Sequence, residues 1–70
     1  MNAFTMARTI ARRVALVRTA LANHGNNEAQ RLLHEAKLRA LEALSDDLSF
    51  AVYKNAASRR QFMKLCGFEG

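Results

Sequence analysis

The side chains best suited to catalysis or metal binding are few in this 70-residue sequence, and they stand far apart. The single cysteine, Cys66, cannot form an intrachain disulfide, and neither His24 nor His34 stands at zinc-site spacing from it. We expect Cys66 to be a packed thiol. We expect His34 to be a partly buried residue at the edge of the apolar face of its helix. The sequence has no Gly-rich phosphate loop and no recognisable Ser/His/Asp set or carboxylate pair. We therefore expect no enzymatic activity, no metal site and no cofactor.

Basic side chains form a more informative pattern. Eleven Lys and Arg against six Asp and Glu give a net charge of +5, and residues 1–27 contain no acid but four arginines: Arg8, Arg12, Arg13 and Arg18. A second basic cluster consists of Lys54, Arg59, Arg60 and Lys64. Such clusters can bind the phosphates of DNA or RNA, so a small basic nucleic-acid-binding protein is one hypothesis. The sequence lacks the tight glycine turn of a helix-turn-helix and the aromatic signature of RNA modules, which favours a solvated or protein-facing surface.

Two segments resemble targeting signals. The acid-free start is similar to a mitochondrial presequence or a membrane-surface helix, and residues 58–64 (SRRQFMK) resemble a twin-arginine export motif. An export signal precedes a long apolar stretch, whereas only six residues follow this motif in the sequence. No run approaches the roughly 20 apolar residues of a membrane span. With a single cysteine and no leader pattern, we expect a reducing, cytoplasmic setting without a membrane.

Helix-forming residues dominate the elements that must carry these side chains. Proline is absent and glycine occurs three times, while alanine, leucine and arginine are abundant. The sequence predicts one all-α domain over residues 1–70, with helices at about 3–22, 28–44, 46–57 and 59–66. We expect the first two to form an antiparallel helical hairpin, followed by a short C-terminal helical segment.

Capping residues predict where the first two helices begin and end. Gly25 can end the first helix in the left-handed conformation, and Asn27 can cap the second, with Gln30 at capping-box spacing. The segment 45–47 (Ser-Asp-Asp) has two interpretations. Ser45 can cap a new helix with two acids in its first turn, or one helix can continue through the segment. We favour a break or bend there.

The C-terminal segment carries its own capping signals. Ser58 and Gln61 have capping-box spacing, with Ala57 and Phe62 placed as the hydrophobic staple. Gly67 is predicted to end the last helix in the left-handed conformation, with Phe68 folded back on it.

Large apolar side chains are few, yet some fall outside the core-facing pattern. Half of the 70 residues, 35, are apolar, but 13 of them are alanine, which leaves 22 for a core. Leu16, Leu38, Phe50 and Tyr53 cannot all face one small core. We therefore expect a homodimer that forms a helical bundle.

These features favour binding over catalysis. We expect a small regulatory or adaptor protein that binds another protein through a helical surface and inhibits or modulates it, by analogy with small bacterial or phage-encoded regulators, which are often built this way. The expected partner-binding residues, chosen for their aromatic and arginine side chains, are Phe50, Tyr53, Arg59, Arg60 and Phe62. In the alternative interpretation, the three aromatic residues of this set clamp the last helix onto the hairpin.

Overall fold

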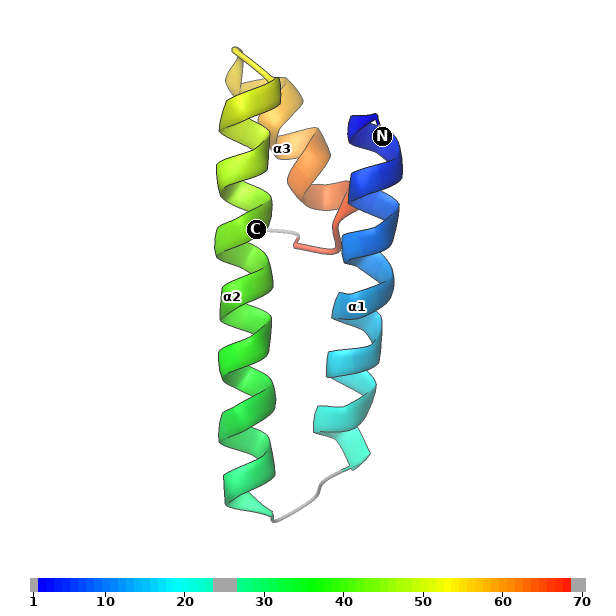
Figure 1. Cartoon of the computed structure of the whole chain (residues 1–70), viewed down its shortest axis with the longest axis vertical. Helices are drawn as coiled ribbons and strands as arrows, with labels where there is room; N and C mark the ends of the chain where they lie inside the picture. The colour runs from blue at the N-terminus through cyan, green and yellow to red at the C-terminus, as the bar shows by residue number, and fades with distance from the viewer. Residues whose placement is uncertain (1, 24–26, 69–70) are drawn as a thin grey trace.

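Three helices make up the fold. The computed structural model describes residues 2–23 and 27–68, with α1 at Ala3–Asn23, α2 at Glu28–Val52 and α3 at Ala56–Leu65. Figure 1 shows α1 and α2 side by side and running in opposite directions, with α3 packed at the end where α1 begins and α2 finishes. No strand occurs within residues 2–23 and 27–68, so the all-α prediction is confirmed.

The second helix is continuous, which corrects the predicted break at residues 45–47. Over 25 residues α2 joins the segments predicted as separate helices at 28–44 and 46–57. The Ser45 hydroxyl donates to the Leu41 carbonyl oxygen at 2.7 Å, one turn back in the same helix, and does not cap a new one. The Ser49 hydroxyl likewise donates back to the Asp46 carbonyl oxygen at 2.7 Å. The helix ends at Val52, earlier than the predicted boundary at residue 57.

The N-terminal caps of α2 and α3 are both asparagines. The Asn27 side chain accepts from the Gln30 backbone N–H at 3.1 Å, which confirms the predicted cap of α2. At α3 the cap is Asn55, whose side chain accepts from the Ser58 N–H at 2.7 Å, so the prediction that Ser58 caps this helix was wrong. The helix begins three residues before the predicted start because the chain leaves α2 at Val52 and needs only a short extended turn. The predicted left-handed Gly25 lies outside the described residues.

The end of α3 has the predicted glycine cap. Gly67 has a φ of +99°, and its N–H donates to the Lys64 carbonyl oxygen at 3.0 Å. The Phe68 N–H donates to the Met63 carbonyl oxygen at 2.9 Å. This pair of bonds is the Schellman motif, which reverses the chain and returns Phe68 toward the helices.

The core lies where the three helices meet. Its buried apolar side chains come from α1 and from the end of α3: Ala7, Ile10, Val14, Phe62 and Cys66. On α2 the fully buried side chains are Ser45 and Ser49, whose hydroxyls are satisfied within their own helix. Their small size lets Cys66 approach α2 closely enough to form a hydrogen bond with the Ser45 side chain. The whole molecule measures 41 × 17 × 17 Å, and the core is confined to the end where α3 packs against α1 and α2.

Candidate protein-binding groove

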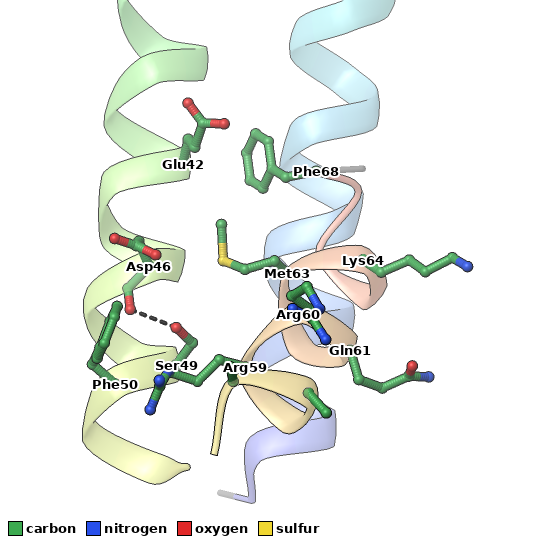
Figure 2. A pocket seen from close by; sticks show the side chains of 12 residues that line it. Glu42, Asp46, Ser49, Phe50, Arg59, Arg60, Gln61, Met63, Lys64 and Phe68 are labelled. Carbon is green, nitrogen blue, oxygen red and sulfur yellow. Dashed lines mark hydrogen bonds between the residues drawn. The ribbon is translucent and has the colours of Figure 1, made fainter. Parts of the chain in front are cut away.

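A groove opens between α2 and α3 on the surface of the molecule (Figure 2). Its volume is about 950 Å³, and we call it the α2/α3 groove. Glu42 and Asp46 line it on α2, whereas Arg60 and Lys64 stand on α3, so its two walls carry opposite charges. The other lining residues are Ser49, Phe50, Ala56, Ala57, Arg59, Gln61, Met63 and Phe68. In Figure 2 the Met63 side chain points toward α2, while Lys64 extends away from it.

Phe50 and Arg59 form a preorganised pair at one end of this groove. The Phe50 ring is 62% exposed, and the Arg59 guanidinium carbon lies 4.3 Å from its centroid, a cation–π geometry. The same guanidinium donates from Nη1 to the carbonyl oxygens of Tyr53, at 3.3 Å, and Lys54, at 2.8 Å. Arg59 therefore ties α3 to the C-terminal end of α2, where the helix dipole favours a cation.

Tyr53 and Phe62 lie behind the groove. Phe62 is 1% exposed and belongs to the core, so in this conformation it offers no contact surface to a partner. The half-buried Tyr53 ring packs against it, with centroids 5.9 Å apart and planes tilted by 53°. The structure thus divides the predicted partner-binding set: Phe50, Arg59 and Arg60 line the groove, while Tyr53 and Phe62 pack against each other in and beside the core.

Sequence reasoning did not include Glu42, Asp46, Met63 and Phe68 in the site. Glu42 and Asp46 are four residues apart, so they share a helix face only if α2 continues through residues 45–47. The predicted break concealed that relation. Met63 and Phe68 have no signal of their own, because their place follows from the packing of α3 and from its glycine cap.

The four arginines of α1 do not form one patch. All are exposed, but Arg13 lines a hollow beside Leu16, whereas Arg18 lies over the Phe68 ring at 5.9 Å and lines another hollow. At 100° per residue, Arg13 and Arg18 stand about 140° apart around the helix. Only Arg8 and Arg12, one turn apart, remain close neighbours on one face.

Cys66 lies in the core, and His34 contacts the backbone of its own helix. Cys66 is fully buried, and burial raises the pKa of its thiol, an effect partly opposed by a hydrogen bond with the Ser45 side chain. The thiol is therefore neutral at neutral pH and shielded from reagents. His34 Nδ1 lies 2.8 Å from the Gln30 carbonyl oxygen in the same helix.

Residues 2–23 and 27–68 also bear on metal binding and on membrane insertion. This part of the chain brings together no group of three His, Cys, Asp or Glu side chains that could hold a metal ion. None of its helices combines the length and the apolar character needed to span a bilayer.

Comparison with known proteins found no family model, no curated protein and no solved structure that matches this chain. Function therefore has to be inferred from the surface of the chain itself.

Proposed function

We propose that this protein is a small, non-enzymatic regulatory protein of the cytoplasm that binds another protein in the α2/α3 groove and inhibits it. The observation that carries the proposal is the groove itself, a hollow of about 950 Å³ with opposite charges on its walls and an exposed Phe50 at its end. A helix of the partner suits such a groove if it places basic side chains toward Glu42 and Asp46 and acidic ones toward Arg60. Inhibition then follows from covering the partner's surface.

Phe50 is the expected anchor of the interaction. Aromatic and arginine side chains are enriched among residues that dominate binding energy. The Phe50 ring is already held by Arg59, which is fixed in turn by the carbonyl oxygens of Tyr53 and Lys54. Little side-chain entropy is lost when a ring held in this way becomes buried, so the pair is suited to recognition.

In this proposal the protein acts as a homodimer. Its buried apolar core has five members in the described residues, and several large apolar side chains remain exposed. Pairing two copies covers such surface and adds stability that a core of this size does not supply alone.

Affinity capture from lysate of the source organism, with and without nuclease treatment and in moderate salt, tests the binding proposal. The bait variants are Phe50→Ala and Arg60→Glu in the groove, with Arg12→Gln as an exposed control on α1. We expect one protein to be retained by the wild type and by the control, and to be lost with both groove variants. The melting temperature of every bait is measured, so that lost binding is separated from lost folding.

Two outcomes contradict the proposal. Equal retention by the wild type and both groove variants places the binding surface elsewhere. Retention that disappears with nuclease and depends on Arg12 supports the nucleic-acid hypothesis instead, since phosphate contacts are sensitive to salt and carried by exposed cations.

A further inference from the structure

One exposed face of α2, turned away from α3, carries a heptad pattern. Its residues follow at spacings of four and three, all are exposed, and we call them the α2 stripe: Leu33, Lys37, Ala40, Leu44, Asp47 and Ala51. Leu33 is 48% exposed and Leu44 50% exposed. Alternating spacings of four and three are those of the seam between two paired helices.

A shallow apolar hollow adjoins this stripe between α1 and α2. It measures about 420 Å³ and is lined by Arg13, Leu16, Val17, Lys37, Ala40, Leu41 and Leu44. Leu16, at 71% exposed, is the most exposed of the large apolar side chains in the described residues. The hollow and the stripe together form a face on which apolar side chains have no cover within the chain.

The stripe is complementary to itself when a second copy runs antiparallel to it. Around a two-fold axis level with residue 42, Ala40 meets Leu44 of the second copy, and Leu33 meets Ala51 of the second copy. Each of these layers sets a large side chain against a small one, as close helix packing requires. The same axis sets Lys37 opposite Asp47 of the second copy, so every layer is matched in size or in charge.

We propose that the α2 stripe is the homodimer interface and that α2 packs antiparallel against α2 of a second copy in this register. The inference deepens the proposed homodimer and rests on it, but not on the α2/α3 groove, which lies on another face of α2. In the pair, Leu44 of the second copy lies against the hollow beside Leu16 and covers it.

The charges of the α2 stripe favour α2 of a second copy over an unrelated helix as the element that packs on it. No acidic residue lies three or four positions from Lys37, and no Lys or Arg lies three or four positions from Asp47, so neither has a partner at helical spacing. Within one helix the two are ten residues apart, or about 15 Å, too far to meet. Among the described residues the ion pair within 4.0 Å is Arg31–Glu35, which involves neither. Arg13 beside the hollow adds a second cation that favours an acid from the other copy.

Surface area agrees with a missing partner. The accessible surface is 5028 Å², whereas a compact monomer of this mass has about 4400 Å². The excess of about 600 Å² reflects the elongated shape, 41 × 17 × 17 Å, whose long sides offer room for a partner that buries roughly 800 Å² of each copy.

Reversal of one charge at a time tests the register. Lys37→Glu alone and Asp47→Lys alone each place like charges opposite one another at two symmetric positions. We expect each to weaken dimerisation about tenfold in sedimentation equilibrium, because two exposed pairs change from attraction to repulsion. The double variant Lys37→Glu/Asp47→Lys should restore the wild-type dissociation constant. Since these residues cannot meet within one chain, rescue can come only from contact between copies.

Cysteine pairing gives an independent measurement. Leu33→Cys and Ala51→Cys are made as separate proteins, mixed and oxidised mildly; 18 residues, or about 27 Å of helix, separate the two positions within one chain. The yield of disulfide-linked dimer should be higher in the mixture than in either protein alone. Each single variant also contains the buried Cys66, so it measures the background of disulfide formation that the mixture must exceed.

The outcomes separate the two proposals. A wild-type monomer across the micromolar range overturns both the homodimer and its register. A dimer that neither charge reversal weakens, or that the double variant fails to restore, places the interface on another face. Phe50→Ala, which changes the α2/α3 groove alone, should leave the dissociation constant of the dimer unchanged, whatever its effect on partner capture.

Discussion

Substitution of Gly67 tests the C-terminal motif that directs Phe68 back toward the helices. With a φ of +99°, Gly67 occupies a region that costs an L-amino acid about 1–2 kcal/mol. A Cβ atom there would lie 3.4 Å from Val14 Cγ1 and 3.8 Å from Arg18 Nη1, which are ordinary contacts. The backbone strain therefore sets the magnitude. Gly67→Ala should lower the free energy of unfolding by about 1–2 kcal/mol, or the melting temperature by about 4–8 °C per kcal/mol.

Gly67→Asn is the matched control, because asparagine adopts positive φ more readily than alanine. Thermal unfolding followed by far-UV circular dichroism should rank the proteins wild type, Asn variant, Ala variant, in order of decreasing melting temperature. If the Ala variant melts with the wild type, Gly67 does not need positive φ, and the Schellman motif at the end of α3 is wrong.

Three further perturbations have distinct expected results. Burial raises the pKa of the Cys66 thiol, so the native state favours the neutral form. Below the unfolded-chain pKa of about 8.5, this group should not affect the free energy of unfolding, which should then fall as the pH rises above that value. Urea titrations should show this fall in the wild type and not in Cys66→Ala. Tyr53→Ala should cost about 2 kcal/mol by loss of packing on Phe62, and partner capture should fall only in step with thermal stability. Arg8→Gln/Arg12→Gln should leave the free energy of unfolding within about 0.5 kcal/mol of the wild type, because both side chains are exposed; a large loss of nucleic-acid retention in this variant would favour the alternative function.

The helices were predictable from composition and from caps that act locally. Asn27 and Gly67 perform the roles expected of them, since a cap bonds to backbone groups within a few residues and depends little on the rest of the chain. At the start of α3 two local caps competed. Asn55 prevails over Ser58 because α2 already ends at Val52, a boundary that the sequence did not reveal.

The predicted break at Ser45 failed for a physical reason. A serine hydroxyl can cap a new helix or bond back to the preceding turn, and the local sequence does not decide between them. In the structure the hydroxyl bonds back, and the fully buried Ser45 side chain also forms a hydrogen bond with the Cys66 thiol, which comes from the far end of the chain. This depends on the arrival of α3, which is a tertiary effect.

Residue type located part of the proposed binding groove but not its acidic wall on α2. Phe50, Arg59 and Arg60 were chosen because aromatic and arginine side chains favour interfaces, and all three line the α2/α3 groove. The same criterion selected Phe62, which lies in the core. Composition alone does not distinguish an exposed aromatic ring from a buried one, since both roles require apolar area.

Continuity of α2 links the core to both proposed interfaces. The α2 stripe extends from Leu33 to Ala51 and passes through residues 45–47, so a break there would turn Asp47 and Ala51 out of line with Leu33. Ser45 and Ser49 face the core in this segment, and their hydroxyls bond to carbonyl oxygens of the same helix. The acidic wall of the α2/α3 groove crosses the same segment. A continuous α2 thus packs against α3, presents acids to the proposed partner and keeps a seven-residue repeat for the proposed second copy.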